Sequence, residues 1–123
     1  MDSPAFKKPR EHFDTASNPS HVTFDDGINC RRNFPWAHYV QAYWDYGERD
    51  AIKVEIGEWI VVINGVNIMS LFLAIEQRSL VRVRAQPDLA KDQKYLSDAF
   101  ATEILFTEAP AKQRQGELPL GWK

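Results

Sequence analysis

The clearest hydrophobic pattern lies at Ile52–Ile56, where apolar and charged residues alternate. This period of two predicts a strand that turns three apolar side chains to a core and Lys53 and Glu55 to solvent. Gly57-Glu58 then predicts a two-residue hairpin turn, with glycine in the position where a type II′ turn needs a positive φ. The next segment, Trp59–Ile63, is apolar at every position and rich in β-branched residues. It predicts a central strand that is covered on both faces.

Asn64-Gly65 predicts a tight turn, and the apolar residues after this turn follow a helical period. Residues 68–78 then predict a helix, with Asn67 as its N-cap. One apolar stripe of this helix is expected to face the sheet, and it comprises Ile68, Leu71, Phe72 and Ile75.

Four further segments read as strands or hairpins. They are a hairpin at His21–Cys30 that turns at Asp26-Gly27, an aromatic strand at His38–Tyr46 with Val40, Ala42 and Trp44 on one side, an alternating strand at Leu80–Arg84, and a last strand at Phe100–Thr107. Residues 89–99 are polar and are expected to be loop with a helical turn. The predicted fold is therefore α+β: a mainly antiparallel β-sheet in the order β-β-β-α-β-β, with one helix packed on one face.

The ends of the chain differ from its body. Residues 1–20 are polar, dotted with proline and aperiodic, which predicts a flexible N-terminal arm. Residues 21–108 form the single α+β domain, and residues 109–123 are expected to be a flexible C-terminal tail. The alternative is that arm and tail fold back and complete the core, the tail through Leu118, Leu120 and Trp122.

Composition narrows the class of protein. The chain has 123 residues, 44% of them hydrophobic and 26% charged, which is typical of one globular domain. The net charge of −2 gives no overall field toward nucleic acid or anionic lipid. Cys30 is the only cysteine, so no internal disulfide forms. Because the chain starts without a signal-peptide pattern and Trp59–Ile63 is too short to cross a bilayer, a cytoplasmic protein with no membrane partner is expected.

Motifs for catalysis, metals and cofactors are missing from the sequence. No phosphate-binding glycine loop, nucleophile elbow or zinc-protease motif occurs. His12, His21 and Cys30, with the neighbouring acids, match no zinc or calcium spacing. Cys30 precedes two arginines, which would favour the thiolate, but no nucleophile signature surrounds it. We therefore expect no metal, no cofactor and a non-enzymatic protein.

Apolar surface exceeds what one short helix can cover, and this excess favours a contact role. The candidate interface residues are Trp36, Tyr39, Tyr43, Trp44 and Trp59. Aromatic residues commonly anchor protein interfaces. The leading hypothesis is a protein-binding or assembly module whose partner is another protein or a second copy, docked on an open sheet face.

Two other functions remain open. The first is nucleic-acid binding by arginines near aromatic rings, with candidates Arg31, Arg32, Arg78, Arg82 and Arg84. Its competing explanation is that Arg82 and Arg84 pair across the sheet with Glu55 or Glu103. The second is a small enzyme or enzyme subunit with a pocket near His38, formed with the tyrosines and the loop acids Asp45, Glu48 and Asp50.

Overall fold

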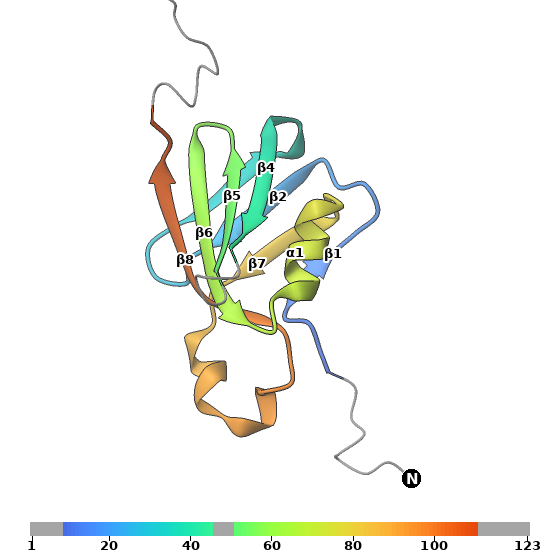
Figure 1. The fold of residues 1–123 in the computed structure, drawn as a ribbon, viewed down its shortest axis with the longest axis vertical. Helices are drawn as coiled ribbons and strands as arrows, with labels where there is room; N and C mark the ends of the chain where they lie inside the picture. Colours follow the sequence, from blue (N-terminus) through green and yellow to red (C-terminus); the bar gives the residue numbers. More distant parts are fainter. Residues whose placement is uncertain (1–8, 46–50, 111–123) are drawn as a thin grey trace, which may run out of the picture.

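The computed structural model describes residues 9–45 and 51–110, which form two β-sheets packed face to face with a helix at one side (Figure 1). The first sheet has the strand order β1-β7-β2-β3, with β1 at Phe13–Thr15, β2 at His21–Asp25, β3 at Arg31–Pro35 and β7 at Leu80–Arg84. The second has the order β4-β5-β6-β8, with β4 at Tyr39–Trp44, β5 at Ala51–Ile56, β6 at Trp59–Val66 and β8 at Phe100–Glu108. The helix α1 is Met69–Glu76, and 3₁₀ turns lie at Trp36–His38, Pro87–Lys91 and Gln93–Tyr95.

The predicted α+β class with mainly antiparallel strands is confirmed. All strand pairs within the two sheets are antiparallel except β2–β7, which is parallel. The single sheet expected from the pattern is instead two sheets. The reason is that β7, which follows α1, lies between β1 and β2. The N-terminal hairpin β2–β3 therefore belongs to a separate sheet with β1 and β7, and this sheet covers the sheet formed by β4, β5, β6 and β8.

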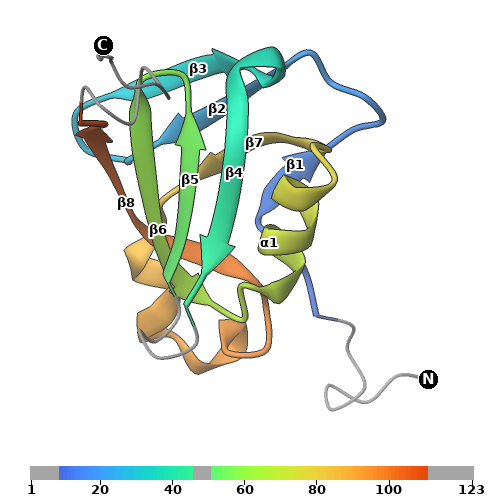
Figure 2. The same ribbon diagram turned by 45° about the horizontal axis from the view of Figure 1, so that its top comes forward.

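The core lies between the two sheets and α1. Ile52, Val54 and Ile56 of β5 have no exposed surface, as the alternation predicted, and they share one core cluster with Val22 and Phe24 of β2. The helix packs against β4 and β7 and closes the open side of the two layers (Figure 2). Of its expected stripe, Ile68, Leu71 and Ile75 are buried and Phe72 is partly buried.

The strand β6 is central in the second sheet, between β5 and β8. Val61 and Ile63 point inward and are fully buried. Ile60 and Val62 lie on the outer face and are only half-buried, so the expectation that both faces are covered is wrong for this face. The first sheet covers the inner face alone.

The N-terminal boundary lies earlier than the sequence indicated. Phe13–Thr15, inside the arm expected over residues 1–20, pairs with β7, and Phe13 packs against the core. The paired residues 13–15 therefore belong to the folded body. At the other end, the Ala109 N–H donates to the Glu58 carbonyl at 2.8 Å. Residues 1–8 and most of the expected tail, 111–123, lie outside the described residues.

Three local expectations are corrected. The β2–β3 hairpin forms, but its loop is five residues, because the Asp26 carboxylate accepts bonds from the N–H groups of residues 28–30 and keeps them out of a strand. Asn64-Gly65 lies inside β6, where the pairing with β8 shifts register. Asn67 has φ 53° and does not cap α1, since its side chain binds another loop.

A bulge in β4 explains why its predicted faces differ from the observed ones. The register shifts between Tyr39 and Gln41, so Tyr39 joins Ala42 and Trp44 on the inner side. Val40 is left on the surface and is 64% exposed.

Candidate docking surface

The helix α1 carries apolar side chains on nearly every side. Its sequence, MSLFLAIE, has only Ser70 and Glu76 as polar residues. Leu71 and Ile75 face the core, whereas Met69 and Leu73 remain 47% and 42% exposed. A helix that is apolar all round is normally buried on all sides. The outer side of α1 therefore keeps two large apolar side chains in contact with solvent. Met69 and Leu73, one turn apart, are called the α1 ridge below.

A groove runs along the α1 ridge on the side of β4. It has a volume of about 440 Å³ and is lined by Ala42, Tyr43 and Trp44 of β4 and by Met69, Phe72, Leu73 and Glu76 of α1. Its walls are tied together by rings, since the Trp44 and Phe72 ring centroids lie 6.1 Å apart. We call it the α1–β4 groove. Tyr43 is 39% exposed, so a binding partner can reach its ring.

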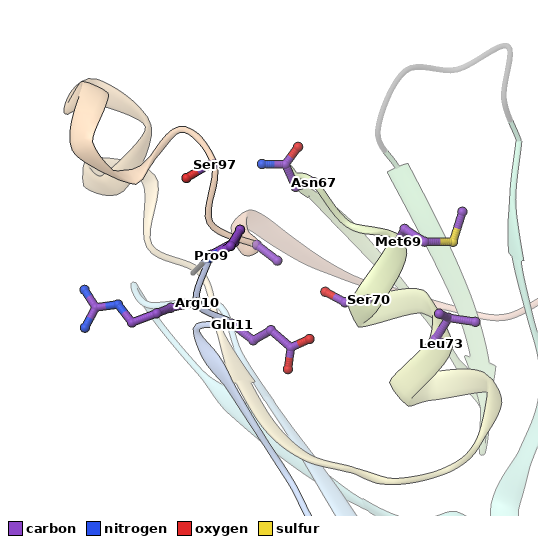
Figure 3. A pocket seen from close by; sticks show the side chains of 9 residues that line it. Pro9, Arg10, Glu11, Asn67, Met69, Ser70, Leu73 and Ser97 are labelled. Carbon is purple, nitrogen blue, oxygen red and sulfur yellow. The ribbon is translucent and has the colours of Figure 1, made fainter. Parts of the chain in front are cut away.

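A second hollow lies on the opposite side of the ridge, between α1 and the N-terminal segment (Figure 3). It measures about 350 Å³, and its lining includes Met69 and Leu73 again, with Pro9, Ala99 and several polar residues. Glu11 and Ser70 point toward each other across it (Figure 3). This is the N-terminal hollow. Because both hollows share Met69 and Leu73, the α1 ridge stands between two concave surfaces.

The N-terminal wall of this hollow is fixed by Asp98. Its carboxylate accepts a hydrogen bond from the Arg10 N–H at 3.0 Å and contacts His12 Nε2 at 2.9 Å. The Arg10 N–H, followed by the His12 side chain, holds the pKa of Asp98 below its ordinary value. The His12 ring is edge-on to the rings of both Tyr95 and Phe100, with a centroid distance of 5.9 Å in each pair.

The loop that carries Asp98 is held to the start of α1 by Asn67. The Asn67 side-chain amide donates to the carbonyls of Leu96 at 2.8 Å and Asp98 at 2.9 Å. Asn67 adopts a positive φ, which asparagine tolerates better than most residues. The base of the N-terminal hollow is thus joined to both the N-terminal segment and the helix.

Only two of the five candidate interface residues, Tyr43 and Trp44, line the α1–β4 groove. Trp36 is 5% exposed and belongs to the core, where its indole N–H donates to the Leu80 carbonyl at 3.1 Å. Trp59 lies on the inner side of β6, in register with Ile56, and is partly buried. Tyr39 is also partly buried, with its ring edge-on to Trp36. All three residues pack against the core and do not line the groove, in contrast to the interface role expected from their residue type.

The environment of Tyr39 shows how closely α1 approaches β4. Burial is the largest cause that raises the pKa of Tyr39, and the charge of Glu76 adds to it. Arg78 and a hydrogen bond with the Ala42 backbone act in the opposite direction. Tyr39 therefore lies near enough to the C-terminal end of α1 for the charge of Glu76 to act on its hydroxyl group.

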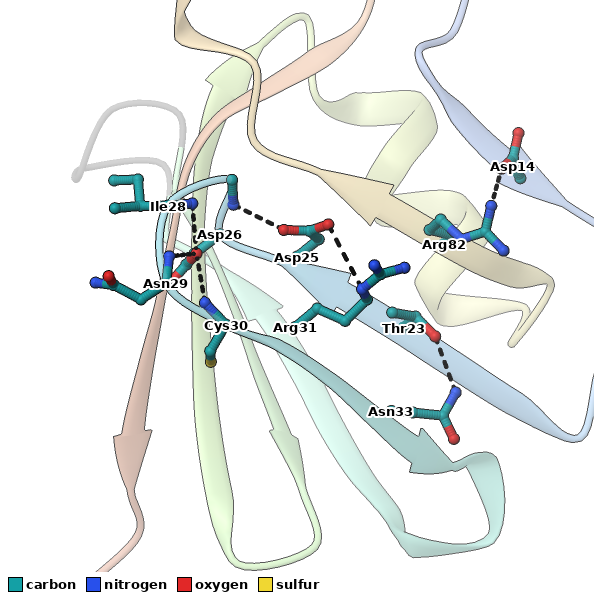
Figure 4. A network of polar contacts seen from close by, with 11 residues as sticks. Asp14, Thr23, Asp25, Asp26, Ile28, Asn29, Cys30, Arg31, Asn33 and Arg82 are labelled. Carbon is teal, nitrogen blue, oxygen red and sulfur yellow. Dashed lines mark hydrogen bonds and ion pairs between the residues drawn. The ribbon is translucent and has the colours of Figure 1, made fainter.

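The five arginine candidates do not share one surface. Arg31 and Arg82 lie on the outer face of the first sheet (Figure 4), and the strand register places Arg84 on the same face. Arg32 lies on the inner side, with its guanidinium carbon 4.0 Å from the centroid of the Trp59 ring and 5.3 Å from that of Phe106. Arg78 is exposed just beyond the end of α1.

The outer face of the first sheet alternates positive and negative charge. Arg82 lies 3.5 Å from Asp14, and Arg31 lies 3.9 Å from Asp25, which is also in register with Arg84 (Figure 4). Arg82 therefore has the acidic partner that the competing explanation requires, but this partner is an aspartate of the first sheet, and Arg84 is only in register with one. Glu55 and Glu103, the partners expected, belong to the second sheet.

The candidate catalytic and metal-binding side chains do not form one site in the described part of the chain. His38 is exposed and lines neither the α1–β4 groove nor the N-terminal hollow. Glu48 and Asp50 lie outside the described residues. Within residues 9–45 and 51–110, no three histidine, cysteine, aspartate or glutamate side chains are grouped in a way that would hold a metal ion.

Sequence reasoning missed the α1 ridge and the Asp98 contacts. The ridge had a signal, since the helix continues apolar past its inward stripe at Met69 and Leu73. The His12–Asp98 contact had none, because the two residues lie 86 positions apart and neither stands in a recognisable pattern.

No helix in the described part of the chain is long and apolar enough to cross a bilayer. Comparison with protein-family models, curated proteins and solved structures finds no match for this chain.

Proposed function

We propose that this protein is a non-enzymatic assembly module that binds a second copy of itself through the α1 ridge and the α1–β4 groove. The observation that carries the proposal is the exposure of Met69 and Leu73 on a helix with almost no polar face. Leaving such a helix in water costs free energy, and a partner that covers the ridge recovers it.

The shape of the surface favours a second copy over an unrelated partner. A ridge and a groove lie side by side on α1, and a two-fold axis places each ridge in the groove of the other copy. Met69 and Leu73 are four residues apart, which is the spacing of the side-chain rows that interlock when two helices pack. Tyr43 and Trp44, at the groove, are residue types that anchor interfaces.

The open sheet face expected from the sequence is a weaker candidate for the same role. The outer face of the second sheet places Tyr43, Lys53, Val62 and Leu105 in one row across four strands. Leu105 is 48% exposed, but Lys53 interrupts the apolar row. Because Tyr43 belongs to this row and also to the α1–β4 groove, the row extends the docking surface rather than replacing it.

Sedimentation equilibrium over a range of concentrations tests the proposal. The wild type is expected to form a dimer, and Leu73→Glu is expected to raise the dissociation constant by about 10–100-fold, since the dimer would cover the exposed 42% of Leu73 in both copies, which is worth roughly 1.3–2.5 kcal/mol. Leu96→Glu is the matched control, because Leu96 is 50% exposed and lies away from the groove.

A wild type that stays monomeric at every concentration would overturn the proposal. Equal weakening by Leu73→Glu and Leu96→Glu would also overturn it, because it would show that the ridge has no particular role. Circular dichroism of both variants shows that they are folded before the comparison is made.

A further inference from the structure

The strand β8 forms one edge of the second sheet and is the longest strand in the described part of the chain (Figure 1). One side of β8 pairs with β6 from Phe100 to Glu108. On the other side, the Ala101 carbonyl accepts a hydrogen bond from the Gln86 N–H at 2.8 Å. Beyond that point, no strand among residues 9–45 and 51–110 lies beside residues 102–108 on this side.

The alternation within an antiparallel pair decides which backbone groups of β8 are directed away from β6. The Ala109 N–H donates to the Glu58 carbonyl, and the register repeats this hydrogen-bonded kind of pair at every second residue, back to Leu105. The N–H and C=O groups of Ile104 and Phe106 therefore point to the open side of β8. Such a row of backbone groups is a template for a further strand.

The sequence of this edge has few of the features that keep exposed strand edges from pairing. Residues 102–108 read TEILFTE and contain no lysine, proline or glycine. Most of them are β-branched or aromatic, and such residues favour strands. Only Glu103 and Glu108 are charged, and Leu105 is 48% exposed on the outer face. The edge is therefore well suited to accept another strand.

The order of polar and apolar residues in this segment is symmetric about Leu105. Two polar residues, three apolar residues and two polar residues follow one another. An antiparallel pair of such segments around a two-fold axis at Leu105 sets Ile104 opposite the partner's Phe106. It also sets Glu103 opposite the partner's Thr107. Apolar residues then face apolar residues, no two carboxylates are opposed, and the outward backbone groups of both copies bond each other.

We propose that the β8 edge pairs with the β8 edge of a second copy, in an antiparallel register centred on Leu105. The contact joins the second sheets of two copies into one continuous sheet. It goes beyond the proposed function, because α1 contacts β4, at the opposite edge of the second sheet from β8. One chain can therefore make both contacts at once, which links dimers into larger assemblies. A single strand pair buries less surface than a stable interface, so this contact forms at high protein concentration.

Hydrogen exchange measured residue by residue with NMR tests the contact, because neighbouring amides of β8 differ. The Ile104 and Phe106 amides are expected to exchange about two- to tenfold more slowly at about 1 mM protein than in dilute solution, as pairing protects them. The Leu105 amide is bonded to β6 and should exchange slowly at every concentration. Leu73→Glu is measured beside the wild type, since it weakens the α1 contact and leaves β8 unchanged. The slowing is expected in both proteins.

Two lysine substitutions on the outer face of β8 form a matched pair in the Leu73→Glu background. Leu105→Lys sets two lysines opposite each other at the two-fold axis, so it is expected to abolish the slowing. Thr107→Lys sets each lysine opposite the partner's Glu103, so it should keep the slowing or increase it. Both positions are exposed, and slow exchange of the amide at position 105 shows that β6 and β8 remain paired.

Four results would contradict the proposal. One is exchange at Ile104 and Phe106 that stays fast up to about 1 mM. Another is slow exchange there that is the same at every concentration, because it would show that the edge is covered within one chain. Slowing that is lost in Leu73→Glu would assign the effect to the α1 contact instead. Equal loss in Leu105→Lys and Thr107→Lys would exclude the register centred on Leu105.

Discussion

His12 and Asp98 come from distant parts of the chain and meet with Nε2 and Oδ2 2.9 Å apart. The same carboxylate also accepts the Arg10 N–H at 3.0 Å, so one buried side chain fastens the N-terminal segment to the loop before β8. The partners differ in kind, because one is a backbone group and the other a side chain. The attachment therefore depends on the path of the backbone at Arg10 and on the identity of the side chain at position 12.

Asp98→Asn should destabilise the protein by about 1–3 kcal/mol, because bonds to a charged acceptor are replaced by weaker ones in a site with little water. Urea unfolding measures the change. Asp88→Asn serves as the control, since the Asp88 carboxylate is exposed and lies 3.6 Å from Lys91 on the surface. Equal stability losses in the two variants would contradict the role assigned to Asp98.

The contribution of Asp98 should also depend on pH. The pKa of Asp98 is lowered in the folded protein relative to the ordinary value of 3.8. A lowered pKa means that the stabilisation is fully present above 3.8 and is lost as the pH falls through the folded value. The difference in unfolding free energy between wild type and Asp98→Asn should therefore shrink in acid below 3.8, and a difference that grows there would contradict the assignment.

Arg32 and Arg31 are neighbours in sequence but lie on opposite faces of β3, which makes them a matched pair. Arg32→Ala should cost about 1–2 kcal/mol, because it removes the guanidinium from the Trp59 ring and the buried stem from the core. Arg31→Ala should change the unfolding free energy by less than about 0.5 kcal/mol, since its pair with Asp25 is at the surface.

Arg32→Met refines this prediction. The Arg32 Nε atom is buried and has no hydrogen-bond partner among residues 9–45 and 51–110, so its burial opposes the ring contact. Methionine keeps the apolar stem and removes that penalty, and it should recover most of the stability lost in Arg32→Ala. Thermal unfolding of the three variants measures the order, and an Arg32→Met variant no better than Arg32→Ala would contradict it.

Asn67 combines a backbone requirement with two side-chain bonds, and substitutions separate them. Asn67→Gly keeps the positive φ and loses the bonds to Leu96 and Asp98, which should cost about 1 kcal/mol. Asn67→Ala should cost about 1 kcal/mol more, because alanine resists the left-handed conformation. Urea unfolding of both variants measures the difference, and equal values would show that the backbone conformation carries no strain.

The strands of the second sheet were predictable because the order of apolar and polar side chains within each short segment reflects which face of the strand is buried. Ile52–Ile56 alternates because one face is core, and the apolar run Trp59–Ile63 marked a strand in the middle of the sheet, although its outer face is only half-buried. The division into two sheets left no such signal. Leu80–Arg84 reads as an alternating strand whichever sheet it joins, and its place between β1 and β2 depends on contacts with residues far away in sequence.

The candidate docking surface was only partly predictable for a similar reason. Tyr43 and Trp44 were identified by residue type, and they line the groove. Trp36 and Trp59 were identified by the same criterion and lie elsewhere, because a large ring suits a core as well as an interface. What distinguishes the surface is the apolar outer side of α1, which becomes visible only once the inward side is known.

The position of β7 also constrains how this chain is made. β7 lies between β1 and β2, so neither of those strands gains its β7 partner until residues 80–84 have been synthesised and have left the ribosome. Until then the β2–β3 hairpin lacks its β7 neighbour, and an unpaired strand edge of this kind is prone to aggregation. Pairing between such distant segments is slow, which makes arrival of β7 a candidate for the rate-limiting event of folding. A nascent chain that stalls before Arg84 would be a natural client for a ribosome-associated chaperone.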